Sequence, residues 1–192
     1  MKDSPKISVP IICSNNEDTI GLVLESIKDI AFEMIVIIDT KSNDKTLEIV
    51  KQYTDKYSVE PWRGFLNQKN EALKRCTGDW VLSLDSDEVV SLELKNEILE
   101  SIKNSNINGY FLNRRTVYLG REMKFAWQPD YRLRLCKRSK EVAWVGEAFH
   151  ETLFVPGKTS KLKGVLLHYS YKDLNDHFNR TLQYAKGVAE IR

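Results

Sequence analysis

Residues 79–88 read DWVLSLDSDE, an apolar run that ends on Asp85, Asp87 and Glu88. A short apolar run bounded by polar residues predicts a buried β-strand over 79–85. Three carboxylates within four residues repel one another, so the arrangement is useful only if a positive charge lies beside it. The stretch therefore predicts a strand with a polar site at its carboxyl end.

The residues before this strand alternate between two sequence patterns. Continuous apolar runs predict strands, and apolar residues at a spacing of three and four predict helices. Strands are expected at 6–13, 33–39, 58–63 and 79–85, and helices at 16–31, 42–57, 67–76 and 92–103. Three strand–helix repeats and a fourth strand predict a parallel sheet with helices on its faces, which binds ligands at the carboxyl ends of its strands.

The second half has a different texture, because several of its apolar runs alternate with polar residues. Strands are expected at 109–120, 130–139, 147–156 and 161–170, followed by a helix from 171 to 192. These strands predict a mixed or antiparallel extension of the sheet. No repeat, linker or low-complexity segment divides the chain, so residues 1–192 are expected to form one α/β domain. The last helical pattern has no cap signal, which predicts a longer helix or a truncated chain.

Composition excludes several classes of protein. The 192 residues carry a net charge of +2, which argues against a nucleic-acid binder. Residues 111–140 are locally basic, and they face either an anion or water. Three widely spaced cysteines predict reduced thiols in a cytosolic protein. The sequence contains no run of about 18 apolar residues, so no membrane-spanning helix is predicted.

Polar side chains follow three of the four predicted strands. They are Asn16 and Glu17, then Asp39, then the acids at 85–88. An Asp-x-Asp triplet alone is commonly a helix cap or a solvated turn, so the joint pattern is what favours a site. Hard oxygen ligands favour Mg²⁺ or Mn²⁺, and such an ion completes its shell with phosphate oxygens and water. The edge therefore predicts a metal-bridged nucleotide diphosphate.

The segments NEDTI (16–20), IVIIDTKSNDKT (35–46), GFLNQKNEAL (64–73) and GDWVLSLDSDE (78–88) together resemble glycosyltransferase family 2. This family consists of inverting enzymes with the GT-A fold. The later segments PDYRLRLCKR, FHETL and LLHYS are similar to its lipopolysaccharide inner-core glucosyltransferase branch. The resemblance covers about residues 6–187. It implies a nucleotide-sugar-binding half at 1–104, an acceptor-side half at 105–171 and a C-terminal helix at 172–192.

The resemblance also implies roles for single residues. Asp87, Asp85 and His168 would hold the metal, with Asp87 as the direct ligand. Asp39 would contact the uracil or ribose, and Lys69 would lie near the phosphates or the sugar. The implied donor-binding set is Asn16, Glu17, Asp39, Gln68, Lys69, Asn70, Asp85 and Ser86. One departure is Lys41, which stands where the family usually has glycine.

Inversion at the sugar carbon requires a base for the acceptor hydroxyl. The resemblance favours Glu151, beside His150, with Glu147 and Asp130 as rivals; each could equally be an exposed carboxylate. Arg132 and Arg134 would meet an anion or point into water. Two tryptophans, Trp127 and Trp144, either stack on a sugar or fill the core.

The function predicted is an inverting glycosyltransferase that uses Mg²⁺ or Mn²⁺. It moves a sugar from a nucleotide-diphosphate donor, a UDP-hexose, to a cell-envelope saccharide or lipid-linked acceptor. We expect it in the cytoplasm, with peripheral contact at the inner face of the cell membrane. The alternatives are a haloacid dehalogenase-type phosphatase that uses Asp85 as nucleophile, and a non-catalytic nucleotide-sugar-binding relative.

Overall fold

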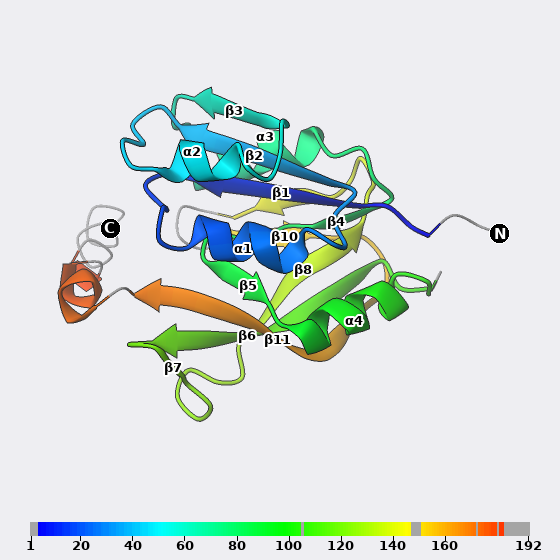
Figure 1. Ribbon diagram of the computed structural model, residues 1–192. Coiled ribbons are helices and arrows are strands. Elements are labelled where there is room, and N and C mark those ends of the chain that lie inside the picture. Colours follow the sequence, from blue (N-terminus) through cyan, green and yellow to red (C-terminus); the bar gives the residue numbers. More distant parts are fainter. Residues whose placement is uncertain (1–3, 105, 147–150, 172, 180, 183–192) are drawn as a thin grey trace.

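The computed structural model describes residues 4–104, 106–146, 151–171, 173–179 and 181–182 (Figure 1). Its main feature is a nine-stranded sheet in which eight strands have the order β3-β2-β1-β4-β8-β6-β11-β5, and β7 pairs with β6. The remaining described strands, β9 and β10, form a separate antiparallel pair. Strands from both halves of the chain thus share one sheet.

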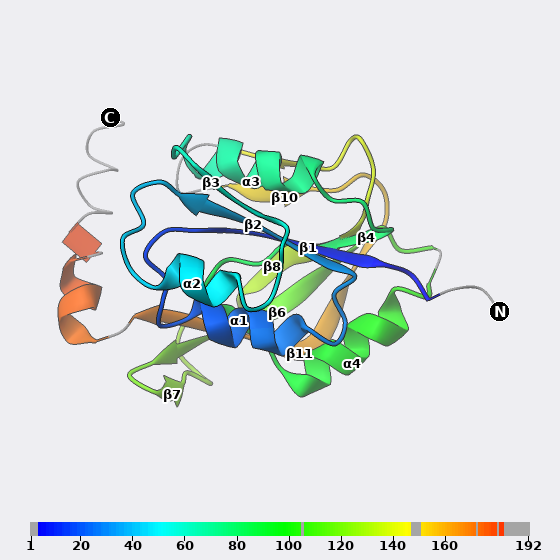
Figure 2. The same ribbon diagram turned by 45° about the horizontal axis from the view of Figure 1, so that its top comes forward.

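The first part of the sheet is parallel and lies at the centre of the core. Every residue of β1 and β2 is buried, which explains their nearly continuous apolar sequences. The elements are β1 (Ile7–Cys13), α1 (Ile20–Ile27), β2 (Glu33–Asp39), α2 (Thr46–Val50), β3 (Tyr57–Glu60), α3 (Phe65–Lys74) and β4 (Trp80–Leu82). In Figure 2, α1 and α2 cover one face of this part and α3 covers the other, as the strand–helix repeats predict.

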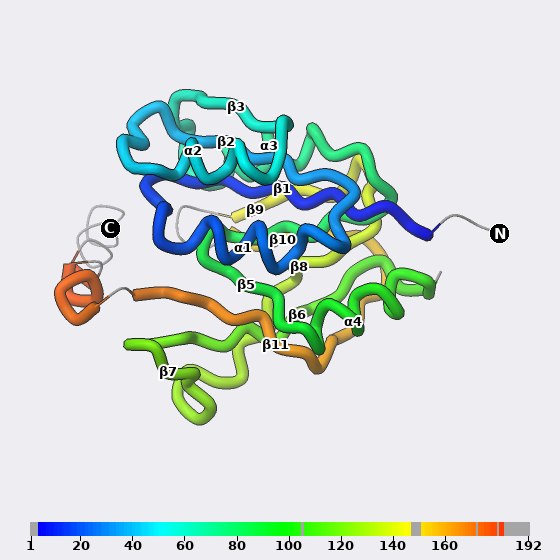
Figure 3. The backbone as a smooth tube through the Cα atoms, in the orientation of Figure 1, coloured from blue at the N-terminus to red at the C-terminus, as the bar shows by residue number. Residues whose placement is uncertain are grey.

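The second part of the sheet is mixed. Strand β8 is antiparallel to β4 and to β6, whereas β6 and β11 are parallel. The elements are β5 (Glu88–Val90), α4 (Leu92–Ser101), β6 (Gly109–Tyr118), β7 (Arg121–Glu122), β8 (Tyr131–Lys137), β9 (Ala143–Val145), β10 (Thr152–Phe154) and β11 (Thr159–Tyr171). The tube in Figure 3 shows β6 and β11 running side by side toward the edge at which β1 and β2 end.

Some predicted elements differ from those observed. Helix α2 ends at Val50, not at 57, because Tyr57 begins β3 and pairs with Val36. Strands β5 and β9 were not predicted, because each has three residues and is fixed by a distant partner, β11 or β10. At the C-terminus, residues 174–179 and 181–182 are helical, as predicted, and 183–192 lie outside the described residues.

A buried carboxylate ties the sheet together at the opposite edge, where β2 begins. Glu33 Oε1 accepts hydrogen bonds from Ser8 Oγ (2.6 Å) and from Thr77 N (2.6 Å). Its Oε2 lies 2.6 Å from Lys56 Nζ. Burial of Glu33 opposes its ionisation, but these partners outweigh that effect and lower its pKa from 4.5 to about 2. This cluster joins the starts of β1 and β2 to the residues that precede β4.

Candidate functional site

The order of the parallel strands reverses between β1 and β4, because β2 and β3 follow on one side of β1 and β4 lies on the other. Open α/β sheets bind ligands at the carboxyl ends of the strands beside such a reversal. Ser14 follows β1, Asp39 ends β2, and Asp85 lies three residues beyond β4. The topology therefore brings the predicted polar clusters to one edge of the sheet.

The loops that follow β1 and β2 are joined by hydrogen bonds. Asn16 N donates to Thr46 Oγ1 (2.8 Å), and Glu17 N donates to Asp44 Oδ2 (2.9 Å). In return, Lys45 N donates to Glu17 Oε2 (3.0 Å). Asn16 Oδ1 accepts from Ser14 N (2.8 Å), so this side chain shapes the turn that follows β1. These predicted donor-binding residues thus belong to one rigid two-loop unit.

Asp39 is held at the base of this two-loop unit. It is buried, its Oδ1 accepts from Lys41 N (3.1 Å), and its Oδ2 accepts from Ser14 Oγ (3.3 Å). Lys41, the departure from the family pattern, uses its backbone N–H here and is exposed. The loop therefore accommodates lysine without displacing the Asp39 carboxylate from the strand end.

Both carboxylate oxygens of Asp85 contact a cation. Lys69 Nζ lies 2.8 Å from Oδ1, and Arg134 Nη2 lies 2.5 Å from Oδ2. Burial of Asp85 opposes its ionisation, but the charges of Arg134 and Lys69 outweigh that effect and hold its pKa well below the ordinary value. Two basic side chains of the chain itself therefore supply positive charge at the fourth strand.

Glu88 is fully buried and shares Arg134 with Asp85. Arg134 donates through Nε to Glu88 Oε2 (2.9 Å) and through Nη2 to Oε1 (2.7 Å). Arg114 Nη1 lies 3.5 Å from Glu88 Oε1, and Glu88 Oε2 accepts from Asp85 N (3.1 Å). These partners offset the cost of removing the Glu88 carboxylate from water. The alternation of Arg132 and Arg134 along a predicted strand indicated from the sequence that Arg134 could meet an anion. Its pairing with Glu88 depends on the tertiary structure.

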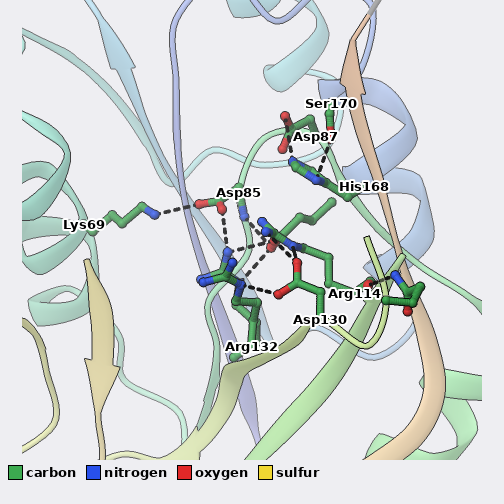
Figure 4. A network of polar contacts seen from close by, with 11 residues as sticks. Lys69, Asp85, Asp87, Arg114, Asp130, Arg132, His168 and Ser170 are labelled. Atoms are coloured by element: carbon green, nitrogen blue, oxygen red, sulfur yellow. Dashed lines mark hydrogen bonds and ion pairs between the residues drawn. The ribbon is translucent and has the colours of Figure 1, made fainter. Parts of the chain in front are cut away.

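Asp130 continues the series of charges toward β6 and β8. Its Oδ2 lies 2.7 Å from Arg114 Nη2, and its Oδ1 lies 2.7 Å from Arg132 Nε. The side chains thus alternate in sign, from Lys69 at one end to Arg132 at the other (Figure 4). Asp130, a predicted rival for the base, has each oxygen bound to an arginine.

Asp87 does not take part in this alternating network, and its carboxylate faces a histidine ring. Its Oδ2 is 3.4 Å from His168 Nε2, and the opposite ring nitrogen, Nδ1, is 2.7 Å from Ser170 Oγ (Figure 4). Strand β11 places both partners, because His168 is paired with Glu88 of β5 and Tyr169 N donates to Asp87 O (2.9 Å). Asp87 and Asp85, two residues apart, therefore have different kinds of partner.

The remaining predicted residues lie around the network. Gln68 is fully buried, and neither amide atom has a hydrogen-bond partner among the described residues. The Asn70 side chain instead bonds to the backbone of Trp144, donating to its O (2.9 Å) and accepting from its N (2.9 Å). Ser86 lies in the turn between the two aspartates.

Of the predicted bases, Glu151 can be placed beside β10. Its Oε1 is buried without a hydrogen-bond partner among the described residues. Glu147 and His150 lie outside the described residues. Glu151 therefore differs from Asp130, whose two oxygens each meet an arginine, in having one oxygen without a hydrogen-bond partner in the described part of the chain.

The donor set around Asp87 fits a divalent ion. A carboxylate oxygen and an imidazole nitrogen 3.4 Å apart are close enough to bind one ion together. The Ser170 hydroxyl orients the ring, as outer partners of metal-binding histidines do. Within the described part of the chain, no three His, Cys, Asp or Glu side chains converge as a metal site. Two protein ligands are nevertheless sufficient for an ion that also takes phosphate oxygens and water.

Comparison with known proteins assigns the family. The protein-family model described as "Glycosyl transferase family 2" matches residues 8–151, three quarters of the chain. The chain belongs to glycosyl transferase family 2. The prediction of a family 2 glycosyltransferase is thereby confirmed, and so is its fold class, a GT-A type sheet with a mixed extension.

Two curated glycosyltransferases match this family 2 chain along nearly its whole length. An uncharacterised glycosyltransferase of Rickettsia typhi is 31% identical over 96% of the chain and 67% of the relative. The lipopolysaccharide core biosynthesis glycosyltransferase LpsC of Rhizobium meliloti is 31% identical over 96% of the chain and 70% of LpsC. The predicted likeness to the lipopolysaccharide core branch is thus confirmed, and the chain spans about two thirds of these relatives' length.

A solved structure shares the fold. It is that of a mycobacterial protein, 22% identical, with a TM-score of 0.50 over 60% of this chain and 43% of that one. In the part of the family 2 chain that the structure describes, none of the helices has the length and apolar character needed to cross a bilayer.

Proposed function

We propose that this chain transfers a hexose from a UDP-sugar donor to a cell-envelope saccharide or lipid-linked acceptor, with inversion at the sugar carbon. The observation that carries the proposal is the contrast at the end of β4. Asp85 is neutralised by Lys69 and Arg134, while Asp87 faces His168 and forms no ion pair with a Lys or Arg of the described residues. The family assignment supports sugar transfer as the chemistry of this site.

The nucleoside would bind over the two-loop unit. Asp39 offers a carboxylate at the end of β2, beside the rigid loops that carry Asn16 and Glu17. A carboxylate accepts hydrogen bonds from the N–H of a uracil or the hydroxyls of a ribose. The diphosphate would then reach the edge between β1 and β4, where Lys69 is only 12% exposed and close to the site.

The divalent ion, Mg²⁺ or Mn²⁺, would be held by Asp87 and His168. When bound, it would supply positive charge that stabilises the departing diphosphate. Ser170 would keep the His168 ring oriented, and Tyr169 N holds the backbone of Asp87. Ligation by Asp85 stays a prediction, because it would require Asp85 to give up Lys69 or Arg134.

Glu151 would act as the base. As the acceptor oxygen forms its bond to the sugar carbon, the hydroxyl proton passes to the Glu151 carboxylate, and the bond from that carbon to the phosphate oxygen breaks. The products are the glycosylated acceptor, UDP and a protonated Glu151, which returns its proton to water. Its Oε1, which has no hydrogen-bond partner among the residues that the structure describes, supports this role over Asp130, whose two oxygens face Arg114 and Arg132. Replacement of Glu151 by Gln should lower kcat by about 10²- to 10⁴-fold.

Work at the inner face of the cell membrane is supported by the C-terminal helix. Leu174, Phe178 and Leu182 recur every four residues and are more than half exposed. Exposed apolar residues at this spacing suit the interface of a bilayer. The protein should co-sediment with vesicles that contain an anionic lipid, and Phe178→Glu should weaken this binding. If, in the presence of vesicles, the wild-type protein stays in the supernatant to the same extent as the variant, the location is contradicted.

The test of the function is a hydrolysis and transfer screen of nucleotide sugars with Mg²⁺ and with Mn²⁺, comparing wild type with Asp87→Ala. We expect turnover of a UDP-sugar, lost at least a hundredfold in the variant. Metal-dependent binding without turnover would favour the non-catalytic relative. Phosphate release from a simple phosphoester, abolished by Asp85→Asn, would favour the phosphatase, although both Asp85 oxygens already bind cations.

A further inference from the structure

Trp144 covers the two cations that hold Asp85. Lys69 Nζ lies 4.3 Å from the centre of the Trp144 ring, and Arg134 Cζ lies 5.3 Å from it. The same Lys69 and Arg134 groups bind the two oxygens of Asp85. The Lys69 and Arg134 side chains are 12% and 6% exposed, and Trp144 is 3% exposed, so these contacts are shielded from water, and cation–π attraction is stronger in such desolvated sites.

The ring is held by its backbone and its faces. The Asn70 amide makes two hydrogen bonds with the backbone of Trp144, both 2.9 Å long. The indole N–H has no hydrogen-bond partner among the described residues, so it does not set the orientation of the ring. Two consecutive residues of α3 thus contact Trp144 in different ways. Asn70 hydrogen-bonds to its backbone in β9, and Lys69 lies between its ring and Asp85.

We propose that Trp144 is a positioning residue for the donor site, and that Asn70 sets its place. The ring keeps Lys69 and Arg134 on Asp85, so that positive charge has a fixed position when the diphosphate arrives. Without the ring, the flexible ammonium group of Lys69 would become hydrated and leave this geometry. This inference rests on the proposed function, because it assumes that the site binds a nucleotide diphosphate.

The experiment measures UDP affinity by calorimetry in the presence of Mn²⁺, for wild type, Trp144→Leu, Trp144→Phe and Asn70→Ala. Trp144→Leu should raise the Kd for UDP about tenfold, and Trp144→Phe, which keeps an aromatic face, should stay within about threefold. Asn70→Ala should weaken UDP in the same direction. Trp80→Leu is the matched control, because Trp80 is also 3% exposed and has a cation, Lys137, over its ring. It should leave the Kd unchanged.

A double-mutant cycle separates positioning from general packing. Trp144→Leu should have a smaller effect in a Lys69→Met background than in wild type, because one of the two cations that the ring covers is then absent. Additive effects, an equal loss in Trp144→Phe and Trp144→Leu, or a loss as large in Trp80→Leu would overturn the inference. If wild type binds UDP and Trp144→Leu binds it equally well, only this inference fails; if wild type binds no UDP, the proposed function fails as well.

Discussion

Asp85 and Asp87 are separated by one residue, yet they belong to different environments. Asp85 joins a network in which cations and carboxylates alternate, with Arg134 and Glu88 buried in its middle. Asp87 meets His168, whose other ring nitrogen is bound by Ser170. The strand end therefore divides into the Asp85 side, where Lys69 and Arg134 supply the positive charge, and the Asp87 side, where a carboxylate faces an imidazole.

The difference shows how adjacent carboxylates acquire different roles. Repulsion between them is relieved in two ways: by fixed guanidinium and ammonium groups for Asp85, and in our account by a metal ion for Asp87. Fixed cations make the charge at Asp85 permanent. A metal beside Asp87 would come and go with the phosphates that share it.

The largest expected effect comes from removing Arg134, the central cation of the network around Asp85. Arg134→Met would leave Glu88, which is fully buried, without its main partner, and Asp85 without one of two. Breaking a buried pair by removing one member costs about 3–5 kcal/mol. We expect a loss of about 4 kcal/mol in the free energy of unfolding by urea. Arg132→Met, which removes a half-exposed arginine of the same network, should cost less than about 1 kcal/mol.

Acid titration compares the site with a carboxylate at the opposite edge of the sheet. Glu33 has a folded pKa of about 2 against an ordinary 4.5. The unfolded chain therefore binds the extra proton between these values, and stability is lost as pH falls from about 4.5 toward 2. The contribution at neutral pH is on the order of 3 kcal/mol, and Glu33→Gln should remove that part of the pH dependence. A variant with the wild-type acid profile would show that Glu33 does not carry the effect.

Neutralising each aspartate separately should sharpen the contrast. Asp85→Asn would leave Lys69 without its ion-pair partner and Arg134 with Glu88 alone, and we expect it to cost about 2 kcal/mol of unfolding free energy. Asp87→Asn should cost less than about 0.5 kcal/mol, because within the described part of the chain Asp87 has no ion pair with a Lys or Arg to lose. Thermal unfolding of both variants without metal measures the difference; equal costs would remove the distinction between the two sides.

The smallest effect concerns the orientation of His168. Ser170→Ala removes the hydrogen bond to Nδ1 and should weaken Mn²⁺ binding about tenfold, with stability unchanged. Ser170→Thr, which keeps a hydroxyl, should restore most of the affinity. Titration of Mn²⁺ in the presence of UDP provides the measurement.

The parallel half of the fold and its acidic strand ends could be predicted from sequence, because the relevant signals are local. Apolar runs such as 33–39 are buried on both faces, Asp39 ends β2, and Asp85 lies three residues beyond β4. The partners of the acids could not be predicted. Arg134 reaches Glu88 from a strand that is antiparallel to β4, and Trp144 lies in a three-residue strand fixed by β10. These contacts depend on strand pairings between residues that are far apart in the sequence.

The pulsed electron paramagnetic resonance spectrum of Mn²⁺ bound together with UDP tests the central claim most directly. Our account predicts coupling of the manganese to an imidazole nitrogen in wild type and in Asp85→Asn, and no such coupling in His168→Gln. Manganese that binds with UDP but shows no nitrogen coupling in wild type would contradict the assignment of the ion to Asp87 and His168.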